Sequence, residues 1–219
     1  MIAVINVGTG NIRSIFLALK EVAPKEKICV TSNAQDLKNA KKIVFPGQGS
    51  MNGCLERLKQ TGIAEQIKDV ISDRPFLGIC LGKQILFDFS EEGNSIGLGL
   101  IPGKVVKFQD SMFGNKELKP FFKIPHMGWN QVKIRKKHHL FNGINFSLSK
   151  DGGNSEWFYF VHSYFVQPKE KEISIASTDY GVSFTSVIAR DNLVATQFHP
   201  EKSSKSGLIF LKNFVSWKL

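Results

Sequence analysis

The sequence predicts a three-layer α/β fold, with a mostly parallel central sheet between helices and an antiparallel portion added in the second half. In the first half, short apolar runs alternate with stretches whose apolar residues recur every three or four positions. In the second half, runs of alternating apolar and polar residues follow one another, with turn residues between them. The first pattern is typical of βαβ units whose sheet is covered on both faces, and the second is typical of antiparallel strands.

The elements of the first half follow in order. Short apolar strands are expected at 2–7, 27–30, 42–45 and 76–79. Helices are expected at 11–22, at 51–72 with a break at Thr61-Gly62, and at 84–89. Because short strands separated by helices are joined by crossover connections, these strands should lie parallel in one sheet.

The second half consists mainly of strand-like segments. They cover 104–108, 130–134, 156–166, 172–178, 184–190 and 193–198. A closing helix, at roughly 204–217, places Leu208, Leu211 and Val215 on one side. Because no repeat, low-complexity tract or linker interrupts the 219 residues, we expect a single domain over 1–219.

Cysteine usage and hydropathy exclude several classes of protein. Cys29, Cys54 and Cys80 are an odd number without Cys-x-x-Cys spacing, which argues against a disulfide framework and a zinc ribbon. We therefore expect neither a metal ion nor a cofactor. No apolar run approaches the roughly 20 residues of a membrane helix, and no basic segment precedes the first apolar stretch. A cytoplasmic protein that does not enter the membrane is the expectation.

The net charge of +10 fits either a solvated basic surface or attraction to phosphates or to an acidic partner. The densest basic run, "KIRKKHH" at 133–139, is short and lies between a strand-like segment and a turn. Nucleic-acid binding would require basic residues interleaved with aromatic ones, or a recognised module. We therefore do not expect nucleic acid as a partner.

Unusual residues follow four of the expected strands, where functional groups gather in open parallel sheets. The segments are "NVGTGN" (6–11), "FPGQGS" (45–50), "LGICLG" (77–82) and "TQFHPEKS" (196–203). In the third, the strand stops at Cys80 and a helix follows within a residue or two. Such a turn holds a nucleophile at the sheet edge, and the helix N-terminus favours the thiolate. A free cysteine is more often a buried structural residue, so this segment alone leaves both interpretations open.

His199 and Glu201 favour the nucleophile. A cysteine nucleophile needs an imidazole that carries its proton, and a carboxylate can fix the orientation of that imidazole. In "QFHPEK" the histidine ends an apolar strand, and the His-x-Glu spacing brings the two side chains close together. A cysteine and this pair at strand ends of one sheet indicate a Cys-His-Glu triad.

The segments "GICLGKQ" (78–84) and "HPE" (199–201) resemble the signatures of the class I, triad-type glutamine amidotransferases. Five further blocks are similar, in order, to those of the glutaminase subunits of imidazole glycerol phosphate synthase within that family. The blocks are "GTGNIRS" (8–14), "PGQGS" (46–50), "GLGLIPGKVVKF" (97–108), "PHMGWN" (125–130) and "FVHSYFV" (160–166). The resemblance covers nearly the whole chain and implies the flavodoxin-like fold of the class I amidotransferases.

The resemblance also implies roles for residues. Cys80 would attack the side-chain amide of glutamine, His199 would carry the proton, and Glu201 would orient the imidazole. The expected oxyanion donors are backbone N–H groups at Leu81, Gly47 and Gln48. The residues expected to hold glutamine are Gln84, His162, Ser163 and Tyr164. His162 is an alternative base, but no carboxylate follows it two residues later, so we interpret it as a pocket wall.

A glutaminase of this family implies a partner, because free ammonia would be lost to solvent. The resemblance implies a separate (β/α)8-barrel cyclase subunit in a heterodimer, with Asn11, Arg13 and Lys202 as expected interface residues. The same Asn11 is a natural helix N-cap. Lys83 and Gln48 depart from the family pattern, which has apolar residues there. Both are expected near the mouth of the site, where they could mark a different acceptor enzyme. The alternative function is therefore a paralogous glutaminase, for example one that serves surface-sugar amidination.

Overall fold

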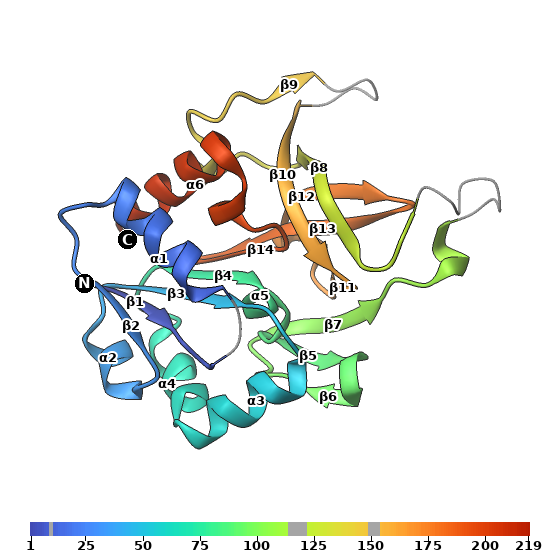
Figure 1. The fold of residues 1–219 in the computed structure, drawn as a ribbon. Helices are drawn as coiled ribbons and strands as arrows, with labels where there is room; N and C mark the ends of the chain where they lie inside the picture. The colour runs from blue at the N-terminus through green and yellow to red at the C-terminus, as the bar shows by residue number, and fades with distance from the viewer. Residues whose placement is uncertain (9–10, 114–121, 149–153) are drawn as a thin grey trace.

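The computed structural model describes residues 1–8, 11–113, 122–148 and 154–219. Its strands form a ten-stranded sheet in the order β2-β1-β3-β4-β14-β13-β12-β8-β10-β9 and a four-stranded sheet in the order β11-β7-β5-β6 (Figure 1). Residues 9–10 of the expected "NVGTGN" segment lie outside the described residues.

The parallel part of the large sheet is built from the first half of the chain and one late strand. Its strands are β1 (Ile2–Ile5), β2 (Ile28–Thr31), β3 (Lys42–Gly47), β4 (Phe76–Cys80) and β14 (Leu193–Thr196). β1 pairs with β2 and β3, and β4 pairs with β3 and β14, all in parallel. The late strand β14 is therefore the direct neighbour of β4.

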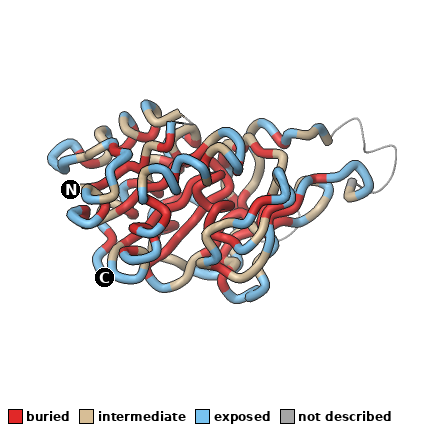
Figure 2. Tube along the Cα trace, turned by 90° about the horizontal axis from the view of Figure 1, so that it is seen from below, coloured by how far each residue is buried: buried red, intermediate tan, exposed pale blue. Residues whose placement is uncertain are grey.

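Helices cover both faces of this sheet (Figure 1). α1 (Ile12–Val22) and α6 (Ser204–Ser216) lie on one face, and α2 (Ala34–Asn39), α3 (Met51–Gln60) and α4 (Ile63–Val70) lie on the other. Each face has its own apolar core: Ile15 and Phe210 belong to one cluster, and Leu58 and Ile67 to the other. All residues of β1, β4 and β14 are buried, and Figure 2 shows the buried residues concentrated in the middle of the molecule. The predicted three-layer α/β fold is confirmed.

The antiparallel portion continues the sheet beyond β14. It contains β13 (Val182–Arg190), β12 (Ser174–Tyr180), β8 (His126–Ile134), β10 (Asn154–His162) and β9 (Ser147–Leu148). All five join their neighbours in antiparallel register. This confirms the expected addition in the second half. The predicted strand at 156–166 is interrupted at Ser163, where the chain passes from β10 to β11 (Tyr164–Pro168) of the second sheet.

The helix expected at 84–89 is wrong. The helical segment α5 covers only Leu81–Gln84, and β5 (Phe87–Ser90) follows it. β5 pairs in parallel with β7 (Ile101–Lys107) and antiparallel with β6 (Ser95–Ile96). The carbonyls of Ile85 and Leu86 accept hydrogen bonds from Leu98 and Leu100. Partners distant in sequence therefore replace the next helical turn, because the short apolar run "ILFDF" suits a strand as well as a helix.

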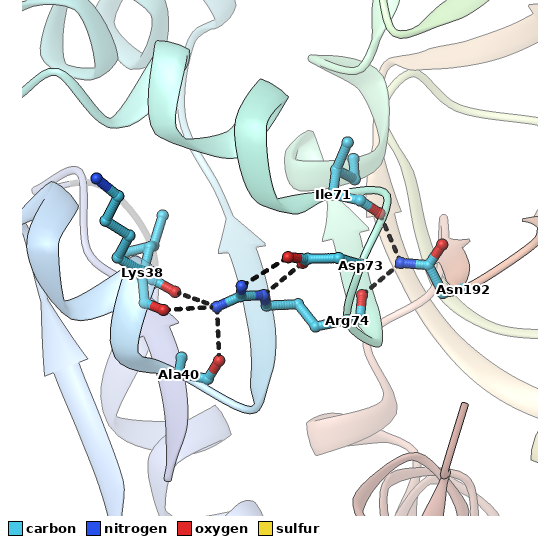
Figure 3. Close-up of polar contacts among 7 residues, drawn as sticks. Lys38, Ala40, Ile71, Asp73, Arg74 and Asn192 are labelled. Carbon is cyan, nitrogen blue, oxygen red and sulfur yellow. Dashed lines mark hydrogen bonds and ion pairs between the residues drawn. The ribbon is translucent and has the colours of Figure 1, made fainter.

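Arg74 ties three segments together at the end of the sheet where β4 begins (Figure 3). Its Nη1 donates to the carbonyls of Leu37, Lys38 and Ala40, at distances of 2.8 to 3.0 Å, and so satisfies the last carbonyls of α2. Its Nε and Nη2 donate to Asp73. Asn192, just before β14, donates to the carbonyls of Ile71 and Arg74. β4 and β14 are therefore anchored to the same loop at their amino ends.

No helix within the described ranges is long and apolar enough to cross a membrane.

Candidate active site

Cys80 stands at the carboxyl end of β4 in a left-handed backbone conformation, with φ of 54° and ψ of −108°. A side chain other than glycine in that region costs about 1–3 kcal/mol and persists only where the surroundings impose it. Here the surroundings are two glycines: a Cβ at Gly82 would lie 1.9 Å from the Phe45 carbonyl oxygen, and one at Gly78 would lie 2.6 Å from the Gly82 oxygen. The glycines therefore permit close backbone packing, and the sharp turn itself occurs at the cysteine.

His199 and Glu201 reach the same sheet edge because β14 is parallel to β4, with Thr196 opposite Ile79. His199 Nδ1 lies 2.8 Å from Glu201 Oε1, and the two side chains are 2% and 3% exposed. A carboxylate only accepts hydrogen bonds, so Nδ1 carries the hydrogen. The other ring nitrogen, Nε2, is buried and makes no well-aligned hydrogen bond within the described part of the chain. It is left for the Cys80 thiol.

The charges of this cluster act on His199. Burial alone would lower its pKa, but the negative charge of the Cys80 thiolate, followed by the Glu201 carboxylate, raises the pKa of His199 to about 10. Since Nε2 lacks a well-aligned hydrogen bond, we take the charge of the thiolate as the main cause. The Cys80 thiolate and the His199 imidazolium therefore stabilise each other as an ion pair.

A cavity of about 540 Å³ opens beside Cys80, a volume that suits a small-molecule ligand. Of the residues expected to bind glutamine or the oxyanion, all but Gly47 line it: Gln48, Leu81, Gln84, His162, Ser163 and Tyr164. Gly47 lies opposite Cys80 in the β3–β4 pairing and directly precedes Gln48, which lines the cavity.

The sequence model of the class-I glutamine amidotransferase family matches residues 3–216 of the chain. The chain belongs to this family. Two relatives, each named imidazole glycerol phosphate synthase subunit HisH, are 46% identical to it. The relative from Aromatoleum aromaticum matches over 220 residues, and the one from Nitrosospira multiformis over 217; each match covers 99% of this chain and 98% of the relative. Within its family the chain therefore belongs with the HisH subunits.

Solved structures agree on the fold. A crystal structure of a glutamine amidotransferase superposes with a TM-score of 0.68 at 16% identity, covering 97% of this chain and 98% of the other. A glutamine amidotransferase from Thermotoga maritima superposes with a TM-score of 0.57 at 13% identity, covering 94% and 77%. At these identities the comparison concerns the architecture alone.

The expected interface residues of this amidotransferase lie at two places. Lys202 lines the cavity, and its ammonium group lies 5.8 Å from the centre of the Tyr159 ring. Asn11 and Arg13 do not line the cavity. Asn11 caps α1 by accepting a hydrogen bond from the Ser14 amide, and Arg13 is exposed. Both residues follow β1, which is two strands away from β4 in the sheet. The distance between the ends of β1 and β4, along the sheet edge that carries Cys80, is therefore roughly 10 Å.

The expectation that Lys83 lies near the mouth of the amidotransferase site is wrong. Its side chain is fully buried, and Nζ donates to the Thr185 carbonyl at 2.6 Å. Burial lowers the pKa of Lys83 well below its usual range. The pairing of β12 with β13 shifts register next to Thr185, and the Lys83 amine donates a hydrogen bond to the Thr185 carbonyl at this irregularity. Lys83 therefore points into the interior, away from any partner surface.

Two further residues, which were not expected from the sequence, lie against Cys80 and His199. Gln197 is fully buried, and its Nε2 lies 3.7 Å from Cys80 Sγ. Ser203 Oγ donates to the His199 carbonyl at 2.6 Å and accepts from the Tyr159 amide at 3.0 Å, which fixes the histidine backbone against β10. The only sequence signal was polar residues on either side of "FHPEK".

Metal ligands do not gather in the described ranges: no three His, Cys, Asp or Glu side chains there are placed to hold an ion.

Proposed function

We propose that this chain is the glutaminase subunit of an imidazole glycerol phosphate synthase, acting as one domain over residues 1–219. It hydrolyses glutamine to glutamate and ammonia, and the ammonia passes to a cyclase partner in histidine biosynthesis. The observation that carries the proposal is the buried Cys80–His199–Glu201 arrangement beside a cavity of about 540 Å³. The 46% identity to HisH subunits over 99% of the chain supports the choice of pathway.

In the first half of the reaction, the Cys80 thiolate attacks the side-chain carbonyl carbon of glutamine. The new C–S bond displaces the carbonyl electrons onto oxygen, and backbone N–H groups at Leu81, Gly47 and Gln48 stabilise that oxyanion. His199 then gives its Nε2 proton to the leaving nitrogen. The C–N bond breaks, ammonia departs, and a γ-glutamyl thioester remains on Cys80.

In the second half, neutral His199 takes a proton from a water molecule, and the resulting hydroxide attacks the thioester. The C–S bond breaks and releases glutamate, the thiolate returns, and His199 is again the imidazolium. One water is consumed for each glutamate and ammonia. Glu201 keeps the hydrogen on Nδ1, so that Nε2 is the nitrogen that exchanges protons in both halves.

Glutamine is held by Gln84 and by the segment 162–164, all of which line the cavity. Gln84 Nε2 donates to the Tyr164 carbonyl at 2.9 Å, which fixes its amide next to Cys80. Burial and the neighbouring His126 hold the pKa of His162 well below its usual range. A neutral His162 is suited to lining the pocket, whereas His199 carries the proton.

The partner covers the mouth of the cavity. Met127, Trp129 and Trp157 are 62%, 49% and 50% exposed on neighbouring strands, an apolar cluster of the kind that marks a protein interface. Met127 also lines the cavity, so a protein seated there closes it from solvent. We propose a (β/α)8-barrel cyclase as this partner in a heterodimer, with Asn11, Arg13 and Lys202 among its contacts. The free thiols of Cys29, Cys54 and Cys80 suit the reducing cytoplasm.

We assign the acceptor pathway from the similarity to the HisH relatives, because the two departures from the family pattern, Lys83 and Gln48, do not argue for another acceptor enzyme. Lys83 is buried and contacts the core, so it no longer argues for a different acceptor enzyme. Gln48 lines the cavity, and its role as an oxyanion donor uses the backbone, which is indifferent to the side chain.

The deciding experiment measures glutamate release by the purified chain with a HisH-type cyclase partner and its nucleotide substrate. We expect release from the complex, poor release from the chain alone, and loss of release in Cys80→Ala. The same complex supplied with ammonium salts should still form imidazole glycerol phosphate in the Cys80→Ala variant. Full glutamate release by Cys80→Ala would contradict the nucleophile. If glutamate forms but no cyclase product appears with glutamine, the acceptor assignment is wrong.

A further inference from the structure

A line of hydrogen bonds runs from β8 through two buried imidazoles to the glutamine pocket. Asn130 Nδ2 lies 3.2 Å from His126 Nε2, and His126 Nδ1 lies 2.9 Å from His162 Nε2. His162 Nδ1 lies 2.8 Å from the Tyr164 carbonyl, which also accepts from Gln84. This line, hereafter the histidine relay, consists of Asn130, His126 and His162, and it ends on the carbonyl that holds Gln84.

The direction of the relay follows from its end. A carbonyl oxygen can only accept, so His162 Nδ1 carries a hydrogen, and in the neutral ring Nε2 is then an acceptor. His126 Nδ1 must therefore donate, which makes His126 Nε2 the acceptor for the Asn130 amide. The Asn130 side chain agrees: its Oδ1 accepts from the Gln131 amide at 2.7 Å, and its Nδ2 also donates to the Asp179 carbonyl at 3.0 Å. Every donor in the relay thus points toward the pocket.

The surroundings keep both imidazoles neutral and in place. His126 is stacked between Tyr180 and Phe160, with ring centroids 3.9 and 4.9 Å away and interplanar angles of 27° and 25°. Burial lowers the pKa of His126 to about 4 and holds the pKa of His162 well below its usual range. No carboxylate hydrogen-bonds to either ring in the described part of the chain. Neither histidine therefore becomes charged near neutral pH.

The pocket end of the relay is saturated. The Tyr164 carbonyl has two lone pairs, and it accepts one hydrogen from His162 and one from Gln84. If His162 took the opposite tautomer, its Nδ1 lone pair would face that oxygen at 2.8 Å and push the carbonyl away. The Gln84 amide, which borders the cavity, would then lose its fixed orientation.

We propose that His126 and Asn130 are positioning residues for glutamine, which act through His162 to fix the Tyr164 carbonyl and the Gln84 amide. The inference rests on the proposed glutaminase function. Along β8, His126 and Asn130 alternate with the exposed Met127 and Trp129. One side of β8 therefore carries the apolar cluster, and the other side carries the residues that position the glutamine pocket. A partner that binds the exposed side of β8 contacts the same strand on which the relay begins.

The main test compares His126→Phe with His126→Asn in the complex with the cyclase partner. Phenylalanine keeps the aromatic stacking and removes both ring nitrogens, so we expect KM for glutamine to rise about tenfold, while kcat changes less than KM. Asparagine places an amide nitrogen where Nδ1 lies and should restore most of the affinity. His138→Phe is the matched control, because that histidine lies outside the cavity lining, directly before the short 3-10 helix η4 (His139–Phe141). Ammonia-dependent cyclase activity should stay unchanged in all three.

Nitrogen-15 NMR of the histidine rings tests the direction of the relay in the unsubstituted chain. We expect both His126 and His162 to be neutral at pH 7, each with its hydrogen on Nδ1. A hydrogen on Nε2 of either ring, or a charged ring, overturns the proposal whatever the kinetics show.

The outcomes separate the relay from the proposed function. If the unsubstituted complex releases glutamate and His126→Phe keeps its KM for glutamine, the relay is refuted and the glutaminase stands. If the unsubstituted complex releases no glutamate, the proposed function has failed, and the NMR result still decides the relay. Should His126→Phe not fold, Asn130→Ala at the half-buried end serves instead, with an expected rise in KM of about threefold. An unchanged KM in that variant overturns the proposal equally.

Discussion

Replacing Cys80 by alanine should lower the pKa of His199. Two groups raise that pKa against the opposing effect of burial: Cys80, whose influence is the larger, and the Glu201 carboxylate. The substitution removes the first and leaves Glu201 in place. The measurement therefore separates the thiolate from the carboxylate as the cause of the imidazolium.

The expected size follows from the same interactions. Together they raise the pKa of His199 from 6.5 to about 10 in spite of burial. Because the influence of Cys80 is larger than that of Glu201, we expect the pKa of His199 to fall from about 10 toward its ordinary value of 6.5 in Cys80→Ala. Each unit of that fall corresponds to about 1.4 kcal/mol of lost stabilisation of the imidazolium.

The chain offers an unusually clean assay. It has five histidines, and the other four all have a lowered pKa: His126 and His138 of about 4, with His139 and His162 also shifted downward by burial. A histidine NMR signal that titrates above pH 8 can therefore belong only to His199, and its loss in His199→Gln confirms the assignment. Cys54→Ala is the control, because burial raises the pKa of that thiol to about 12 and keeps it uncharged.

An alkaline titration that persists unchanged in Cys80→Ala would refute the thiolate–imidazolium pair. It would show that Glu201 alone sustains the charge on His199. A shift of the same size in Cys54→Ala would count against the assignment in a different way, because it would point to a general loosening of the core.

Three further substitutions test the packing around the site. Lys83→Met should raise the free energy of unfolding at pH 7, because the unfolded state binds a proton at Lys83 that the folded amine lacks. The gain in stability should shrink as the pH rises toward 10.5, and urea unfolding at pH 7 and 10 measures it. Gly82→Ala should lower the free energy of unfolding by about 1–3 kcal/mol and abolish glutamate release, because its Cβ would meet the Phe45 carbonyl. Arg74→Met should cost about 1–2 kcal/mol in thermal unfolding and leave kcat intact, because its partners lie at the opposite end of β4 and are partly solvated.

Much of the fold, and the placement of Cys80, His199 and Glu201 at one edge of the sheet, could be predicted because both depend on local patterns. Apolar runs with turn residues gave the strands of the parallel sheet, and the carboxyl ends of parallel strands share one edge. A cysteine, a histidine and a glutamate that follow such strands are therefore brought together by the architecture. That β4 and β14 are direct neighbours depends on long-range pairing, which no local pattern encodes.

The failures concern contacts between distant segments. The run "ILFDF" suits a helix or a strand, and β5 forms because the backbone of 98–101 is available to pair with it. A lysine is normally expected at the surface, and Lys83 is buried because a register shift between β12 and β13 offers the Thr185 carbonyl to its amine. The role of Gln197 beside Cys80 depends likewise on the β4–β14 pairing.

The pKa values of two buried imidazoles near Cys80 shift in opposite directions, and this difference favours one of the two histidines as the base. His162 faces a carbonyl and a second neutral imidazole, so nothing offsets the cost of burying a charge, and its pKa falls. His199 is buried as deeply but faces a carboxylate and a thiolate, and its pKa rises. A base must hold a proton between two chemical steps, and only the second environment stabilises the charged ring. The residue type is the same in both places, and the partners of each ring decide which one can exchange protons with the substrate.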